Sequence, residues 1–139
     1  MQSTHRFLIA LGLLLGSVAI HPDMAALQSV DDIPERCQAN DRTQQGYQKG
    51  VDFGMLTVNQ AWDTVNQDCR QLDHLVSILA RTFESLTLPP NATLTVQCRH
   101  EGIGRGGIQA LQDLGPPCGE NVFDSQPMQS LRKQMSQEP

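Results

Sequence analysis

The 139-residue chain has few aromatic residues and no cluster of basic residues. It contains one Trp, one Tyr and four Phe, and its 10 Lys and Arg stand against 15 Asp and Glu, for a formal net charge of −5. Arg132 and Lys133 form its single adjacent pair of basic residues. Binding to nucleic acid requires clustered positive charge that neutralises phosphates. We therefore expect neither DNA nor RNA to be a partner.

The sequence also lacks an apolar run long enough to span a membrane, which needs about 20 residues of helix. The uncharged run over residues 7–20 is shorter and follows Arg6, as in a cleavable export signal. Ser17 and Ala19 give the small-x-small pattern that predicts cleavage after Ala19, and cleavage after Ala26 is the alternative. We expect a periplasmic or secreted protein with no stable membrane anchor once the signal is removed; an uncleaved anchor is the competing interpretation.

The length permits one domain. We divide the chain into the signal at residues 1–19, a helical domain over residues 27–118 and a polar, partly disordered tail over residues 119–139. Within that tail, Pro127 fits the start of a last helix. Its apolar residues lie at steps of three and four, so the helix should dock onto the core: Met128, Leu131 and Met135.

All four cysteines follow the signal, and none belongs to a C-x-x-C pair. An even number in a small exported chain predicts two disulfides rather than a zinc site. Bridged cysteines need Cα atoms within about 7 Å, while helix separates residues by about 1.5 Å each. A Cys37–Cys69 bridge is therefore disfavoured. We predict Cys37–Cys98 and Cys69–Cys118, with Cys37–Cys118 and Cys69–Cys98 as the alternative.

A heptad stripe runs through residues 51–86, where apolar residues recur at alternating steps of four and three, a period that places them on one side of a helix. It contains a seven-residue duplication, Thr-Val-Asn-Gln-Ala-Trp-Asp followed by Thr-Val-Asn-Gln-Asp-Cys-Arg, from Thr57 to Arg70. The stripe is Val51, Met55, Val58, Trp62, Val65, Cys69, Leu72, Val76, Leu79, Phe83 and Leu86.

One continuous helix through this stripe would be too long for a compact domain of this size. The duplicated segment is rich in Thr and Asn, which are poor helix formers, so we expect a break between residues 59 and 68. The resulting helices should cover residues 41–60, with a start near Asn40, and residues 68–86, and pack along the stripe. The stripe fits a monomer core and a homodimer seam equally well. The predicted fold class is all-α: a disulfide-linked helical hairpin, one or two short helices and one short extended segment.

Glycine recurs every fourth residue at Gly46, Gly50 and Gly54 on the first predicted helix. A stripe of small residues allows another backbone to approach closely. Together with Trp62, a residue type common at binding hot spots, these glycines form the candidate partner surface. Packing within the molecule is the alternative for all four residues.

Residues 93–98 alternate between polar and apolar side chains and predict an extended segment held by Cys98. The glycine-rich stretch over residues 102–107 follows and predicts a hinge or tight turn. It satisfies G-x-G-x-x-G, but no second strand is present to complete a dinucleotide-binding unit. An anion or small molecule held by the backbone of this loop is the second functional hypothesis.

The sequence gives no catalytic, cofactor-binding or metal-binding constellation. His74 and His100 fit solvated or partly packed helix residues, and no nucleophile, base and orienting group occur in a recognisable pattern. We therefore expect no enzyme activity and no cofactor.

Three short motifs carry a resemblance to one family: Gly-Tyr-x-x-Gly-Val from Gly46, an amphipathic helix after Cys69, and a Pro-Cys end at Cys118. Over residues 37–118 they resemble in part the Tai-type periplasmic immunity proteins. The resemblance implies a small, exported, disulfide-linked helical protein that neutralises a type VI secretion toxin. Cys98, the duplicated heptad and the glycine-rich stretch depart from that pattern.

These observations favour an exported helical protein that binds another protein without catalysing a reaction. Its role would be that of an inhibitor, an immunity factor, a chaperone or an envelope assembly component. The alternatives are the small-molecule or ion site at residues 102–107 and the Tai-like immunity function.

Overall fold

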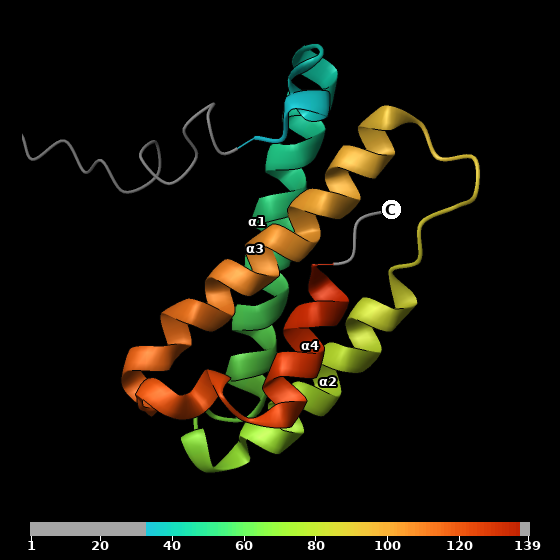
Figure 1. Ribbon diagram of the computed structural model, residues 1–139. Helices are drawn as coiled ribbons and strands as arrows, with labels where there is room; N and C mark the ends of the chain where they lie inside the picture. The colour runs from blue at the N-terminus through green and yellow to red at the C-terminus, as the bar shows by residue number, and fades with distance from the viewer. Residues whose placement is uncertain (1–32, 137–139) are drawn as a thin grey trace, which may run out of the picture.

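The computed structural model describes residues 33–136, so the expected signal, with both of its cleavage sites, lies outside the described residues. Within this part of the chain the fold is all-α with four α-helices and no strand, which confirms the predicted fold class (Figure 1). The elements are η3 (Glu35–Gln38), α1 (Asp41–Thr64), η4 (Cys69–Gln71), α2 (Leu72–Ser85), α3 (Leu94–Cys118), η5 (Glu120–Phe123) and α4 (Gln126–Met135).

Helix α1 begins where the sequence predicts, because Asn40 and Thr43 form a reciprocal capping box. The Asn40 side chain accepts a hydrogen bond from the Thr43 amide at 3.1 Å, and the Thr43 hydroxyl accepts one from the Asn40 amide at 3.2 Å. Both bonds satisfy amides that would otherwise lack partners at the helix start. The Thr43 hydroxyl, itself buried, also donates to the Cys37 carbonyl at 2.7 Å and so ties η3 to α1.

The heptad stripe is broken within the duplicated segment, as predicted, and α1 ends at Thr64. Asn66 and Gln67 have φ angles of 56° and 55°, in the left-handed region that ends helices. The Gln67 amide donates to the Trp62 carbonyl at 3.0 Å and satisfies one of the last carbonyls of the helix. The alternative of one continuous helix through residues 51–86 is therefore excluded.

Asp68 follows this break and caps η4. Its carboxylate accepts hydrogen bonds from the Arg70 guanidinium, at 2.8 Å from Nη2, and from the Arg70 amide at 2.9 Å. These two bonds lower the pKa of Asp68 from 3.8 to about 2, and the charge of Arg70 adds to the effect. The Asp68–Arg70 pair lies at the surface, within the connection between α1 and α2.

The main packing partner of α1 is α3 and not α2. The two arms of the predicted hairpin do share one core along the stripe, with Val58 and Val65 in the same cluster as Leu75 and Leu79, but the larger contact of α1 is with α3. Gly46, Gly50 and Gly54 lie against the backbone of Thr95, Arg99 and Ile103 in turn, which shows that α1 and α3 run in the same direction. From the other side, Gly102 and Gly106 lie against the carbonyls of Tyr47 and Val51.

This contact explains why two predictions about the start of α3 are wrong. Residues 93–98 are not extended, because Thr93 caps α3 and accepts a hydrogen bond from the Val96 amide at 3.4 Å. Residues 102–107 are not a hinge, because they lie inside the same helix. Glycine lowers helix propensity, but here it allows α1 and α4 to approach the α3 backbone.

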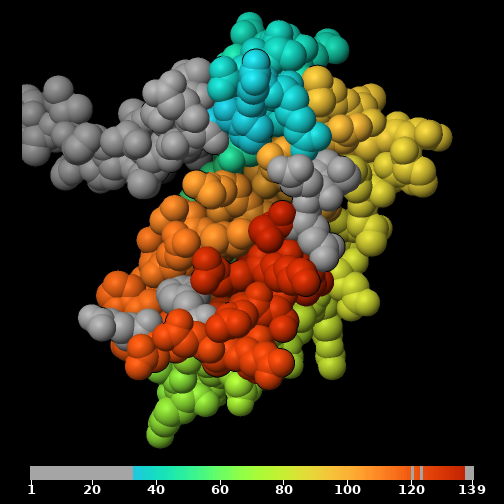
Figure 2. All heavy atoms as spheres, in the orientation of Figure 1, coloured from blue at the N-terminus to red at the C-terminus, as the bar shows by residue number. Residues whose placement is uncertain are grey.

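Helix α4 completes the core by lying between α2 and α3, and Figure 2 shows it on the near face of the molecule between these helices. Its apolar stripe is buried, as predicted: Met128, Leu131 and Met135. The Met135 carbonyl lies where a side chain at Gly104 would stand, and its methyl group lies where one at Gly107 would stand. Residues 120–135, expected to form part of a polar tail, thus belong to the folded domain.

We predict that Gly50→Ala destabilises the protein. Alanine normally favours a helix over glycine by about 1 kcal/mol, so propensity alone predicts a gain. Here the new Cβ would fall on the carbonyl oxygen of Arg99, which is backbone and cannot move without displacing α3. We expect a loss of about 2 kcal/mol or more in the free energy of unfolding, measured by urea denaturation of the oxidised protein.

The matched control is Asn59→Ala, at an exposed position of the same helix. It should leave stability unchanged or raise it slightly, because only propensity changes. A stabilised Gly50→Ala variant would contradict the close contact between α1 and α3.

We further predict that Asp68→Asn lowers the melting temperature at pH 7 and that this effect becomes small near pH 2. The folded state holds the pKa of Asp68 at about 2, below the ordinary aspartate value of 3.8, chiefly through its hydrogen bonds with Arg70. A lowered pKa stabilises the folded state above pH 4, and this contribution decreases as the pH falls below 4 and is lost as the pH falls through 2. Arg70→Gln should show the same pattern, and the double variant should lose no more than either single variant.

Candidate functional site

The predicted partner surface is not a surface in the structure. Gly46, Gly50 and Gly54 are buried against α3, and Trp62 is buried in the core between the helices. The reason is the close approach of the α1 and α3 backbones, which uses the glycine stripe inside the molecule. These four residues therefore pack within the molecule, which was the alternative interpretation of the sequence.

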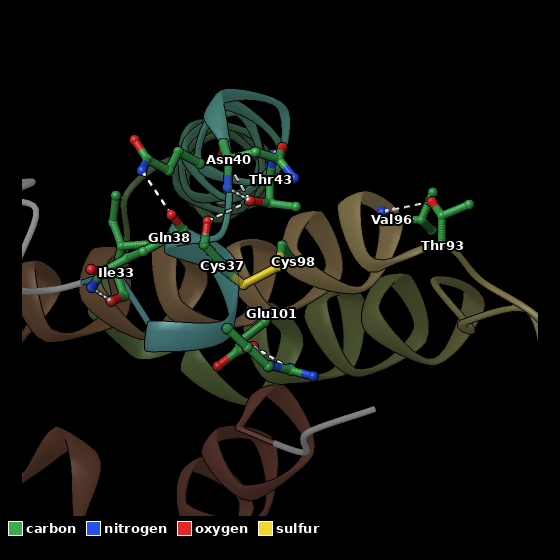
Figure 3. Close-up of a disulfide and its surroundings, with 11 residues drawn as sticks. Ile33, Cys37, Gln38, Asn40, Thr43, Thr93, Val96, Cys98 and Glu101 are labelled. Carbon is green, nitrogen blue, oxygen red and sulfur yellow. Dashed lines mark hydrogen bonds and ion pairs between the residues drawn. A yellow bond between two sulfur atoms is a disulfide. The ribbon is translucent and has the colours of Figure 1, made fainter.

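The first disulfide joins Cys37 to Cys98, with 5.7 Å between the Cα atoms, as the preferred pairing from the sequence has it. Figure 3 shows it linking η3 to the first turns of α3, next to the capping residues of α1. Both cysteines are fully buried. An ion pair between Arg36 and Glu101 crosses the same junction, with Arg36 Nε 3.1 Å from Glu101 Oε2. This end of α3 is thereby fixed to η3.

The second disulfide joins Cys69 to Cys118, with 5.3 Å between the Cα atoms, and matches the other predicted pair. It connects η4, just after the α1–α2 turn, to the last residue of α3. Unlike the first pair, both cysteines are only partly buried. The two bridges thus hold opposite ends of α3, one inside the protein and one near its surface.

A pocket of about 370 Å³ opens where α2, α3 and α4 diverge. Leucines of the α2–α3 connection and residues from the three helices line it, and they continue into a shallower part of about 140 Å³. We call the two parts together the α2–α3 hollow. Its apolar lining is Phe83, Leu86, Leu88, Pro89, Val96, Ile103 and Met135.

The hollow exists because α4 is shorter than α3. Helix α4 fills the groove between α2 and α3 as far as Met135, which lies against Gly104. The Gln134 side chain fixes this end by donating to the Ala80 carbonyl of α2 at 3.1 Å. Beyond Gly104, towards its N-terminus, α3 continues to Leu94 without α4 beside it. The hollow is the continuation of the same groove, and its volume is in the range of ligand pockets.

His100 lines both parts of the hollow. Its Nε2 lies 2.9 Å from the Leu86 carbonyl. Because a carbonyl only accepts, Nε2 carries the proton in this bond. Nδ1 is buried and has no partner in the described part of the chain, an uncommon condition for a buried polar atom. The sequence predicted a partly packed histidine and gave no sign that it lies in a pocket.

The charged residues that line the hollow have opposite signs. Glu84 lies at the end next to Gln134 and Met135, and Arg99 lies at the end next to Pro89 and Val96. Both side chains are exposed, and neither makes an ion pair or a side-chain hydrogen bond with another described residue. The rim is therefore negative at the end next to α4 and positive at the end next to Pro89.

A second apolar feature lies on the outward side of α1. Phe53 and Leu56 are 38% and 53% exposed, between exposed Lys49 and Gln60. Their spacing places them on one side of the helix, which faces away from α3. This narrow stripe does not border the α2–α3 hollow, and we treat it as the weaker candidate.

His74, expected to be a solvated or partly packed helix residue, lies outside the hollow. His74 is exposed on α2. Within residues 33–136 no three His, Cys, Asp or Glu side chains are grouped so that they could hold a metal ion. None of the helices described is both long and apolar enough to cross a membrane.

Comparison with known proteins gives no match: no family model, curated protein or solved structure matches the chain at a significant level. The resemblance to the Tai-type immunity proteins thus remains one of short motifs.

We predict that a mild dithiol reductant opens Cys69–Cys118 before Cys37–Cys98. Thiol-disulfide exchange requires access of the attacking thiolate to sulfur, and only the Cys69–Cys118 pair is partly exposed. Alkylation of the native protein after short reduction, followed by peptide mass spectrometry, should label Cys69 and Cys118 first. Equal labelling of all four cysteines under native conditions would contradict this order.

Proposed function

We propose that this is an exported protein that binds another protein without catalysing a reaction, and that the α2–α3 hollow is its binding site. The observation that carries the proposal is the hollow itself, an apolar groove that the chain's own helix α4 fills only in part. Apolar pockets with a polar rim are the usual anchor points of protein interfaces. Export is supported by the apolar run near the N-terminus and by two disulfides, which persist in oxidising compartments.

The small-molecule or ion site at residues 102–107 loses its basis, because the backbone amides there belong to α3 and are not free to surround an anion. An immunity function of the Tai type is one specific form of the proposed protein binding. An inhibitor, a chaperone and an envelope assembly component are others, and the hollow fits each of them.

The test is capture of a stoichiometric partner from an envelope extract by the oxidised protein without its signal. Val96→Asp places a charge in the hollow at a position that is 42% exposed, so the variant should fold and lose the partner. Leu56→Asp is the matched control, since it adds the same charge on the outward side of α1.

We expect the unmodified protein and Leu56→Asp to retain the partner, and Val96→Asp to reduce its recovery at least tenfold. Failure of the unmodified protein to retain any stoichiometric partner would contradict protein binding. Equal retention by both variants would support protein binding and reject the hollow as its site, whereas loss with Leu56→Asp alone would move the site to α1.

A further inference from the structure

The α2–α3 hollow continues the groove between α2 and α3 that helix α4 fills as far as Met135. Helix α4 places Met128, Leu131 and Met135 between α2 and α3, and these side chains are buried there. Past Met135 the walls remain apolar, since Phe83 and Leu86 continue α2, and Ile103 and Val96 continue α3. A segment that enters the hollow therefore contacts apolar walls of the same two helices that α4 contacts further along. Apolar side chains such as Leu or Met suit these walls.

The charges at the rim add a second requirement. A segment that follows the hollow from the end of α4 to Pro89 passes Glu84 first and Arg99 last. Neither is neutralised by another described side chain. A basic residue near Glu84 and an acidic residue near Arg99 would each gain an ion pair, whereas the same sign at both ends would gain one and oppose one.

We propose that the hollow binds a segment of a partner protein in which apolar side chains lie between one basic and one acidic residue. The basic residue pairs with Glu84 and the acidic residue with Arg99. This inference rests on the proposed function and names the chemistry of its partner. Exposed ion pairs contribute modestly, so each matched charge changes the dissociation constant about twofold to fivefold.

The test uses three capped peptides that share a Leu-Ala-Leu centre and differ in the residues on its two sides. One peptide has Lys and Asp, one has Lys on both sides, and one has Asp on both sides. Each is titrated into the ¹⁵N-labelled oxidised protein, and the amide shifts of Val96, His100 and Ile103 report binding at the hollow. We expect the mixed peptide to bind about twofold to fivefold more tightly than either of the others, with the difference reduced in 0.5 M salt.

Single charge reversals make the test specific, because both positions are exposed and the variants should fold. Arg99→Glu should shift the preference to the peptide with two Lys residues, and Glu84→Lys to the one with two Asp residues. Asp52→Lys, on the exposed side of α1, adds a like change of charge away from the hollow and should leave the preference for the mixed peptide unchanged.

Equal binding of the three peptides, binding outside the hollow, no binding at all, or preferences that Arg99→Glu and Glu84→Lys do not change would each overturn the inference. The capture experiment decides the proposed function separately. A partner lost with Val96→Asp supports the hollow as the binding site even if its sequence shows no charge pattern.

Discussion

The direct contact between the backbones of α1 and α3 is the constraint on which the rest of the structure depends. Both helices carry glycines where side chains would keep them apart, so each helix packs directly against the main chain of the other. Close approach of this kind gives many van der Waals contacts but tolerates little change in volume. It also fixes the relative shift of the two helices, because each glycine faces one particular carbonyl of its partner.

The pairing of α1 with α3 determines where the remaining helices can go. Helix α2 follows the sharp turn at Asn66 and Gln67 and returns along the outside, and α4 then fills the space between α2 and α3. Gly104 and Gly107 admit α4 to a second face of α3, with Phe83 beside them. Because α4 ends at Met135 while α3 extends to Leu94, no helix among residues 33–136 fills the upper part of this groove. The candidate site is thus a consequence of unequal helix lengths.

The sequence predicts those features that depend on local chemistry or on simple distances. The Asn40 cap, the break in the duplicated segment and the last amphipathic helix follow from such arguments. Distance also disfavoured a Cys37–Cys69 bridge, but it left two pairings open, and the structure shows the preferred one. The wrong predictions concern α3. Six residues with four glycines have the composition of a loop, and only the position of α1 and α4 makes a helix favourable there. The hollow was not predictable, because residues near 86, 100 and 135 share no periodicity that would bring them together.

The positions of the two bridges bear on how the hollow could bind a partner. Cys98 lies between Val96 and His100, so the buried Cys37–Cys98 bond and the Arg36–Glu101 pair fix the part of α3 that forms one wall. Cys118 is bonded at the far end of the same helix. A wall held at both ends loses little conformational freedom when a partner binds, which raises affinity without adding contacts. The two cross-links would then also preorganise the candidate site.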